Sequence, residues 1–400
     1  MYLSHLRLAE FRSIHNLDID LPEAGFGVIG RNASGKSSLL EAIAMVSTTR
    51  SPRASLEREL ISWQSGESLG VQPFSRIEAE FIRQDGPQSI EIGLEATGPQ
   101  SNRIRKLITY NRSKIRAGRL VGSFKCVLFE PHDIDLVSGS PGLRRRYLDI
   151  LLSQLDPSYL VSLSRFSRIV EQRNSLIKSL IRDGHSWRDQ ATREQLDYWD
   201  NELVAFGSRI LLRRYRAVAS IEVFARNRIE QFTGGSNLTL SYSASGDAYV
   251  AGTSGVTRSE DVTLSDIAFA MASQLSNARQ DEFRRGMTMM GPHRDDLCIA
   301  VDDIDIGTFG SRGQQRLAAV ALKLAESDLI LSESGELPAI LLDDVFSEID
   351  STHRTLMSRA IGDLGAQVIV TATAADALLA RELALPSLAV LEQGEFNWVR

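Results

Sequence analysis

The chain contains few cysteines and no long apolar run. Only two cysteines, Cys126 and Cys298, occur in 400 residues, and they lie too far apart for metal-ligand spacing. We interpret both as small buried hydrophobic residues of a protein that works in a reducing compartment. No uninterrupted apolar run reaches the roughly 20 residues of a membrane span, and the amino terminus lacks the apolar core of a signal peptide. These absences predict a cytoplasmic protein with no membrane segment.

An excess of positive charge is also missing. The chain has 45 Lys and Arg against 51 Asp and Glu, a formal net charge of -6. This balance argues against a generally basic nucleic-acid binder, so any contact with DNA has to come from local patches. The hydrophobic content of 43% is enough for a substantial core. At roughly 150 residues per domain, the length predicts two or three lobes.

A phosphate-binding pattern stands near the amino terminus. It lies between the apolar run Phe26–Ile29, which is typical of a buried strand, and the helix-periodic segment Ser38–Ala44. The loop comprises Gly30, Arg31, Asn32, Ala33, Ser34, Gly35, Lys36 and Ser37. Its glycines let backbone N–H groups surround a β-phosphate, and the dipole of the following helix points its positive end at the same anion. A chance loop with two glycines is the alternative, and the flanking strand and helix argue against it.

Two side chains of the loop carry the predicted chemistry. Lys36 supplies a mobile positive charge for the β- and γ-phosphates. The Ser37 hydroxyl can join the coordination shell of Mg²⁺. The motif therefore predicts a nucleotide-binding protein.

A second motif lies far downstream, in the apolar run Ala339–Leu342 that ends in two acids. Such a run is typical of a central parallel strand whose carboxylates emerge at its C-terminal edge. Asp343 is then placed to hold Mg²⁺ through water, and Asp344 to orient or deprotonate the attacking water. A strand that ends in a solvated acidic turn is the alternative, which we would favour if the run stood alone.

A Ser-x-Gly-Gln segment opens the helix-like stretch Leu317–Ala325. Its members Ser311, Gly313 and Gln314 form a second anion cradle, built from a hydroxyl, a close backbone approach and a helix N-terminus. The order of phosphate-binding loop, Ser-x-Gly-Gln signature and apolar strand with two acids, followed by Ser347–Asp350, resembles the ATPase head of the ABC/SMC class. In that class two heads face each other, and the signature of one reads the γ-phosphate bound by the other.

Further segments are similar to the RecF family of bacterial recombinational repair proteins. They are Glu130–Asp149, Gly291–Asp296, the acid pair Asp343–Asp344 and the basic pair in Arg50–Arg53. The matches run in the family's order from Leu6 to Thr373, and no departure, such as His132 or Ser38, removes a phosphate or metal ligand. The resemblance implies that Ser38 belongs to the nucleotide site and that Thr373 stands in for the usual γ-phosphate sensor.

The family resemblance also implies an activity and partners. It implies a DNA-stimulated ATPase of weak turnover that uses ATP and Mg²⁺ and forms an ATP-dependent homodimer on gapped or junction DNA. It further implies cooperation with RecO and RecR in loading the RecA recombinase during replication, repair and the SOS response. A transport ATPase subunit and an SMC-like ATPase of the overcoming-lysogenization-defect type are the rivals. The first needs a surface for membrane helices, and the second usually carries an extra nuclease-like domain.

The expected fold class is α/β, an ABC/SMC-type head with an antiparallel β portion and an inserted, mostly helical lobe like a short SMC arm. We expect strands at Leu3–Phe11 and Leu17–Leu21 and an antiparallel pair at Ser75–Arg83 and Gln88–Glu95. Helix-periodic segments cover Leu148–Leu180 and Gln195–Phe232. The expected division is residues 1–140 for the first part of the head, 141–262 for the helical lobe and 263–400 for the second part of the head.

Local basic patches are the candidates for DNA contacts. The densest comprises Arg103, Arg105, Lys106, Arg112, Lys114 and Arg116. An ordinary solvated face is an equally good interpretation of such a charge run. For the triplet Arg144–Arg146, a role beside the nucleotide or at an interface is as good an interpretation as DNA binding. In the turn that holds His293 and Arg294 we favour a structural role over acid-base catalysis, with a contact from Arg294 to phosphate or to the opposing head as the alternative.

Overall fold

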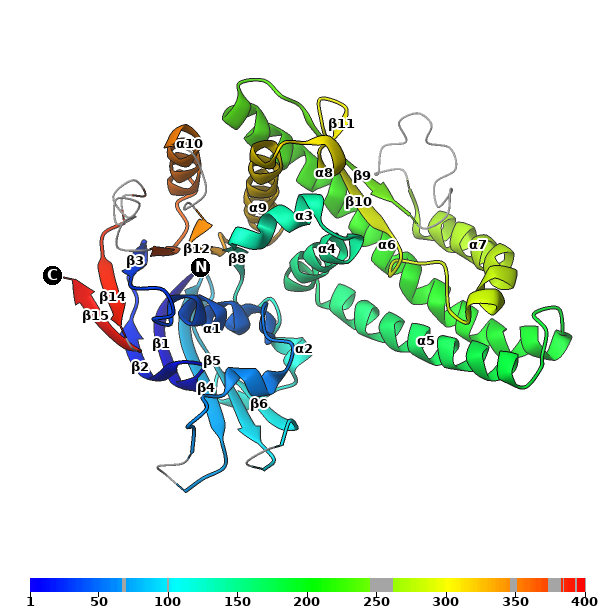
Figure 1. Ribbon diagram of the computed structural model, residues 1–400, viewed down its shortest axis with the longest axis horizontal. Helices are drawn as coiled ribbons and strands as arrows, with labels where there is room; N and C mark the ends of the chain where they lie inside the picture. The colour runs from blue at the N-terminus through cyan, green and yellow to red at the C-terminus, as the bar shows by residue number, and fades with distance from the viewer. Residues whose placement is uncertain are drawn as a thin grey trace. The chain divides into compact units, whose positions relative to one another are not determined.

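The computed structural model describes residues 1–66, 70–98, 101–244, 262–345, 351–372, 383, 385–392 and 394–399. It divides into two compact units, which we call the head unit and the helical unit (Figure 1). The head unit comprises Met1–Ile134, Gln231–Gly234 and Arg316–Arg400, and the helical unit comprises Asp135–Glu230 and Gly235–Gln315. The chain returns to the head unit at Arg316, later than the expected residue 263. The reason is that α7 (Leu264–Arg285) and the strand after it pack within the helical unit.

A mostly parallel sheet forms one half of the head unit. Its strand order is β15-β14-β3-β13-β12-β8, in which only β15 is antiparallel to its neighbour. The strands are β3 (Gly25–Ile29), β8 (Cys126–Phe129), β12 (Ala339–Asp343), β13 (Val368–Ala372), β14 (Leu388–Glu392) and β15 (Glu395–Val399). Every residue of β12 and β13 is buried, as expected for parallel strands covered on both faces.

An antiparallel sheet forms the other half of the head unit. Its order is β2-β1-β4-β5-β6-β7, and β4 pairs with β5 as the sequence predicts. The strands are β1 (Tyr2–Phe11), β2 (Ile14–Asp20), β4 (Phe74–Arg83), β5 (Gly86–Ala96), β6 (Ile104–Tyr110) and β7 (Ser113–Lys114). Buried and exposed residues alternate along β4, so that one face packs against the core.

Helix α1 (Lys36–Thr48) packs between the two sheets, because it contacts β8, β12 and β13 of one and β1 and β4 of the other. Ten of its 13 residues are buried, so it belongs to the core that both sheets share. The remaining helical elements of the head unit are η1 (Glu57–Leu60), α2 (Ala117–Leu120), η2 (Pro131–Asp133), α10 (Ser351–Gly362) and most of α9 (Arg312–Ser334).

Long helices dominate the helical unit. The helices are α3 (Ile134–Ser138), α4 (Pro141–Leu155), α5 (Pro157–Arg182), α6 (Gln190–Thr233), α7 and α8 (Ile306–Phe309). A small sheet of order β11-β10-β9 joins them, with β9 (Leu238–Ser243), β10 (Asp296–Val301) and β11 (Ile304–Asp305). Pro157 opens α5 behind an Asp156 cap, which explains why the predicted helix 148–180 is two helices.

Helices α5 and α6 run antiparallel, as expected for a short arm. Tyr159 near the start of α5 contacts Arg214 just past the middle of α6, whereas Arg173 further along α5 contacts Asp200 early in α6. Figure 1 shows the two helices side by side. Gly207 of α6 allows the close approach of α7, since a Cβ atom there would lie 2.5 Å from Met271 Cε.

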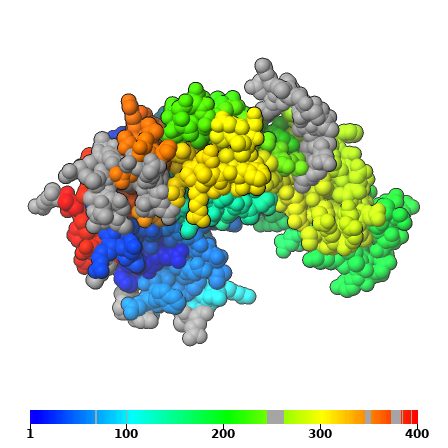
Figure 2. All heavy atoms as spheres, turned by 45° about the horizontal axis from the view of Figure 1, so that its top comes forward, coloured from blue at the N-terminus to red at the C-terminus, as the bar shows by residue number. Residues whose placement is uncertain are grey.

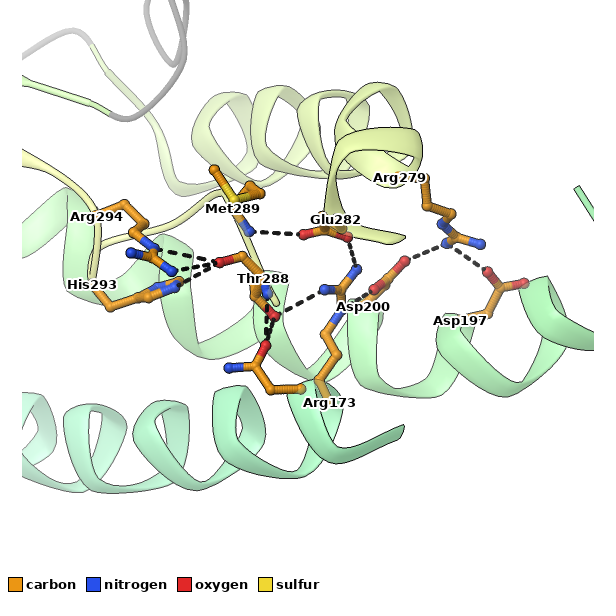
Figure 3. A network of polar contacts seen from close by, with 10 residues as sticks. Arg173, Asp197, Asp200, Arg279, Glu282, Thr288, Met289, His293 and Arg294 are labelled. Atoms are coloured by element: carbon orange, nitrogen blue, oxygen red, sulfur yellow. Dashed lines mark hydrogen bonds and ion pairs between the residues drawn. The ribbon is translucent and has the colours of Figure 1, made fainter. Parts of the chain in front are cut away.

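A buried ion network ties α5, α6 and α7 together (Figure 3). Arg173 is fully buried and donates to Asp200 at 2.7 Å, to Glu282 at 2.6 Å and to the Thr288 hydroxyl at 2.9 Å. Burial acts to lower the pKa of Arg173, but the charges of Glu282 and Asp200 outweigh it and the pKa is raised. The loss of one partner would leave a buried charge uncompensated, so the network holds the three helices in one register.

The prediction that both cysteines are buried is wrong for one of them. Cys126 on β8 is buried, whereas Cys298 on β10 is exposed. Leu297 and Ile299 point inward from β10, so the pleat of the strand turns Cys298 to the outer face. Hydrophobic neighbours in sequence therefore did not reveal which face the thiol occupies.

Candidate nucleotide site

The ends of four parallel strands meet at one edge of the head sheet. The phosphate-binding loop follows β3, Asp343 ends β12, Thr371 lies at the end of β13, and Glu130 follows β8. The carboxyl ends of parallel strands are where α/β sheets bind their ligands. Thr373, which we expected at the site, and the segment 347–350, which belongs to the expected order of motifs, lie outside the described residues.

The loop adopts a backbone that few residues other than glycine allow. Gly35 has a φ of 105°, and a Cβ atom on Gly30 would lie 2.3 Å from the carbonyl oxygen of Leu391. Arg31, Asn32 and Ala33 are exposed, so the curve of the loop faces outward. The buried Ser34 hydroxyl has no hydrogen-bond partner among the described residues. An orphaned, buried hydroxyl in a loop that leads into a helix N-terminus fits a phosphate ligand.

The start of α1 adds further donors and a cation. Gly35 caps α1 without a side-chain hydrogen bond, so the first backbone N–H groups of the helix remain available to an anion. The Lys36 ammonium donates to the carbonyl oxygens of Gly30 at 2.7 Å and of Arg31 at 2.9 Å. Burial lowers the pKa of Lys36, although the charges of Asp344 and Asp343 act in the opposite direction. Ser38 is half-buried in the first turn of the helix.

Ser37 and Asp343 offer a magnesium site. The Ser37 hydroxyl donates to Asp343 Oδ1 at 3.0 Å, and the Thr371 hydroxyl donates to the same oxygen at 2.7 Å. Mg²⁺ takes oxygen ligands, and it is usually held by one or two protein groups together with substrate phosphates. Within the described ranges no group of three or more His, Cys, Asp or Glu residues could hold a metal. A hydroxyl and one carboxylate beside a phosphate-binding loop fit the ion.

Two residues that sequence reasoning did not place in the site join Asp343. Arg53 bonds to Asp343 Oδ2, and it donates to Glu130 at 2.7 Å and to the Ser37 carbonyl oxygen at 3.2 Å. Burial acts to lower the pKa of Arg53, but Asp343 and Glu130 outweigh it and the pKa is raised. The signal for Glu130 was present, since it follows the apolar run Cys126–Phe129 as Asp343 follows its own strand.

Asp344 borders a small cavity in the head unit. Its φ of 50° is left-handed, which is uncommon for a residue other than glycine but tolerated by Asp. The cavity, of about 20 Å³, has room for one water molecule. Its charged lining comprises Asp344, Glu130, Asp133, Arg316 and Lys323. Burial raises the pKa of Asp133 to about 6.

The Ser-x-Gly-Gln signature lies on the surface of the helical unit, at the start of α9. Ser311 and Gln314 cap each other, because the Gln314 N–H donates to Ser311 Oγ at 3.3 Å and the Ser311 N–H donates to Gln314 Oε1 at 2.9 Å. Gly313 is exposed, and a Cβ atom there would meet nothing closer than 4.0 Å. Figure 2 shows the yellow segment around residue 310 at the surface. The cradle is therefore open to a ligand from outside its own unit.

The members of the basic patch in the head unit differ in their exposure and partners. Arg103, Arg105, Arg112, Lys114 and Arg116 are exposed. Lys106 instead pairs with Glu57 at 2.6 Å and contacts the Thr49 carbonyl oxygen. Arg105 and Lys106 are neighbours in β6, so their side chains point to opposite faces of the sheet. Only the exposed members are placed to meet a large partner.

The turn around His293 is built into the helical unit. Arg214 donates to the Pro292 carbonyl oxygen at 2.8 Å. Arg294 donates to the Thr288 carbonyl oxygen at 3.4 Å (Figure 3). Burial, helped by the Arg294 charge, lowers the pKa of His293 to about 4. These contacts favour the structural role that we expected over acid-base catalysis.

The arginine triplet and the acids after His293 also meet inside the helical unit. Arg144 forms a bidentate pair with Asp296, at 2.7 and 2.8 Å, and Arg145 donates to the Asp295 carbonyl oxygen at 2.6 Å. The Asp295 carboxylate accepts a hydrogen bond from the Tyr242 hydroxyl at 2.9 Å. Two motifs about 150 residues apart in sequence form one structural cluster.

Comparison with known proteins consistently indicates one family. The family model described as RecF/RecN/SMC N terminal domain matches residues 2–385. The DNA replication and repair protein RecF of Thermomicrobium roseum is 42% identical over 381 residues, which cover 94% of this chain and 95% of that protein. RecF of Roseiflexus castenholzii is 39% identical over 387 residues, 94% of each chain. RecF of Bacillus subtilis is 33% identical over 379 residues, with 94% and 95% covered.

Solved structures agree with the sequence relatives. A structure of the recombination mediator protein RecF-ATPrS in the RecFOR pathway covers 100% of this chain and 98% of its own, with a TM-score of 0.84 and 26% identity. The SMC head bound to the C-winged helix domain of ScpA has a TM-score of 0.54 at 14% identity, covers 100% of this chain and 97% of its own, and is similar in fold alone. The expected ABC/SMC-type head fold is confirmed. No helix in the described ranges is long and apolar enough to cross a membrane.

Proposed function

This chain belongs to the RecF family, and on that premise we propose that it is a DNA-dependent ATPase of replication and repair. It binds ATP and Mg²⁺ in the head unit, forms a head-to-head dimer on gapped or junction DNA, and leaves the DNA after hydrolysis. Through RecO and RecR it supports the loading of RecA. The observation that carries the proposal is the hydrogen bond between Ser37 and Asp343, which joins the phosphate-binding loop to the acidic strand end.

The loop residues bind and orient ATP. Backbone N–H groups of the loop and of the α1 N-terminus surround the β-phosphate. Lys36 exchanges the carbonyl oxygens of Gly30 and Arg31 for phosphate oxygens, which are stronger partners because they are anionic. Ser37 and Asp343 hold Mg²⁺, which when bound neutralises charge on the β- and γ-phosphates.

Asp344 acts on the water that attacks the γ-phosphate. Its carboxylate orients the water and accepts its proton, and the adjoining cavity of about 20 Å³ is large enough for one water molecule. Arg316 and Lys323 line the same cavity together with the acids Glu130 and Asp133. Little covalent chemistry is required of the protein beyond this step.

The signature completes the site from a second molecule. Ser311 and Gly313 form an exposed cradle at the start of α9, open to an anion from outside. The γ-phosphate bound by one chain is the contact that distinguishes ATP from ADP, so ATP closes the dimer and hydrolysis releases it.

The direct test measures ATP turnover and mass together. ATPase rates are recorded without DNA, with gapped duplex and with intact duplex of the same length, and light scattering is recorded with ATP, with ADP and without nucleotide. We expect faster turnover on gapped duplex and a doubled mass with ATP alone. Equal turnover with and without DNA, together with a monomer under every condition, would contradict the proposal.

A further inference from the structure

The side chain of Arg53 occupies the free oxygen of the magnesium-site carboxylate. Asp343 Oδ1 already accepts hydrogen bonds from Ser37 and Thr371, and Oδ2 accepts one from Arg53. The Asp343 side chain is only 7% exposed, so its charge needs a cationic partner inside the protein. Arg53 is that partner here.

Arg53 and a divalent cation would repel each other if both contacted Asp343 at the same time. A guanidinium and a magnesium ion are like charges, and at hydrogen-bond distances from one carboxylate they would lie within a few ångströms of each other in a partly buried site. Mg²⁺ also has to reach an Asp343 oxygen, directly or through a water ligand, and the guanidinium already occupies Oδ2. One cation therefore has to leave when the other arrives.

The surroundings of Arg53 allow its side chain to move while its backbone stays in place. The Ser51 hydroxyl accepts hydrogen bonds from the N–H groups of Arg53 at 2.9 Å and of Ala54 at 2.7 Å, and it bonds in turn to Glu41 of α1. Glu130 already holds the Arg53 Nε at 2.7 Å. The guanidinium can thus release Asp343 and keep one carboxylate partner.

We propose that Arg53 is a positioning residue that exchanges with Mg²⁺ at Asp343. Arg53 neutralises the carboxylate until the metal enters, and Glu130 then retains the displaced guanidinium. This inference rests on the proposed magnesium-dependent function. It predicts that Arg53 weakens metal binding, which is the opposite of what a residue that only completes the site would do.

The test is binding of Mn²⁺ to the full chain without nucleotide, followed by electron paramagnetic resonance. Arg53→Gln should bind Mn²⁺ at least about tenfold more tightly than the wild type, which corresponds to about 1.4 kcal/mol. The gain should vanish in Arg53→Gln with Asp343→Asn. The matched control is Arg50→Gln, because Arg50 is exposed in the same loop and forms no ion pair among the described residues. Equal or weaker binding by Arg53→Gln, or a gain that survives Asp343→Asn, would overturn the exchange.

A second variant keeps the proposal testable if Arg53→Gln folds poorly. Glu130→Gln removes the carboxylate that retains the displaced guanidinium, so it should weaken Mn²⁺ binding when Arg53 is present. It should have no effect beside Arg53→Lys, because a single ammonium cannot bridge Glu130 and Asp343 as the guanidinium fork does. An equal loss of Mn²⁺ affinity with and without Arg53 would indicate that Glu130 is a direct metal ligand. That result would contradict its part in the exchange. Magnesium-dependent binding of an ATP analogue by the wild type is measured in parallel, so that a failure of the ATP site is distinguished from a failure of the exchange.

Discussion

The hydroxyl of Ser37 lies 3.0 Å from a carboxylate oxygen of Asp343, although 306 positions separate the two residues. This hydrogen bond links the first turn of α1 to the end of β12. Because both groups are ligands that Mg²⁺ accepts, the contact marks the point where the two halves of the proposed nucleotide site meet.

The cation of the phosphate-binding loop is the first target. Lys36→Ala should lose ATP-dependent dimerisation as well as turnover, because the phosphates lose their main cationic partner. We expect turnover to fall roughly a hundredfold or more, the usual effect of removing one preorganised charge. Lys178→Ala, an exposed lysine on α5, is the control and should leave both properties unchanged. Undiminished turnover in Lys36→Ala would contradict the site assignment.

Binding and hydrolysis should separate at the acid pair. Asp344→Asn should bind ATP and dimerise but hydrolyse at least roughly a hundredfold more slowly, since an amide can position water but accepts a proton poorly. The closed dimer should then persist on DNA. Asp343→Asn should instead weaken the magnesium dependence of ATP binding. Normal turnover by Asp344→Asn would move the proton acceptor to another residue.

The salt dependence of DNA binding tests the basic patch of the head unit. Replacing Arg103, Arg105 and Lys106 together with alanine should flatten the log-log plot of affinity against salt, since each lost phosphate contact removes about 0.9 from the slope. Lys106→Ala alone should change the slope little, because Lys106 pairs with Glu57. An unchanged slope in the triple variant would support the alternative interpretation, in which the patch is an ordinary solvated face.

The signature should act across the dimer. Ser311→Arg should leave ATP binding to the monomer nearly intact, because Ser311 belongs to a different unit from Lys36. It should block dimerisation and hydrolysis, since the added side chain fills the exposed cradle. Nucleotide titration and light scattering measure the two effects separately.

Mixing two inactive variants sharpens the same test. In a mixed dimer of Ser311→Arg and Lys36→Ala, one site combines a wild-type loop with a wild-type signature, whereas the other carries both lesions. Activity should partly return on mixing, provided that one intact site can close the pair. If mixed dimers form and no activity returns, the model in which one signature serves the opposite site is wrong.

The stability of the helical unit should depend on pH through His293. Its folded pKa is lowered to about 4 by burial and by Arg294, with smaller effects of Arg145 and Arg173, whereas an unfolded histidine titrates near 6.5. The unfolded state therefore binds the proton first, and stability that is full above pH 6.5 falls by up to about 3 kcal/mol as the pH drops to about 4.

Denaturant unfolding of the full chain at several pH values measures this effect. His293→Gln should flatten the fall between pH 6.5 and 4. His185→Gln, which changes a half-exposed histidine in the turn after α5, is the control. Identical pH profiles for the wild type and His293→Gln would show that another group is responsible.

Local patterns in the sequence were enough to predict the elements of the site. The strand Phe26–Ile29, the loop and the helix behind it are contiguous, and their conformations follow from glycine positions and apolar periodicity. The antiparallel pair β4 and β5 follows in the same way from alternation and a short connection. Such features depend on neighbouring residues, which a sequence displays directly.

Only the tertiary structure decided which distant side chains meet. Arg53 reaches Asp343 across 290 positions and Arg144 reaches Asp296 across 152, and nothing in either local pattern names the partner. The pleat of β10 likewise turned Cys298 outward, and that of β6 set Lys106 apart from Arg105. Strand order and helix packing bring these groups together or apart, because a side chain pairs with whatever the fold places within hydrogen-bond reach.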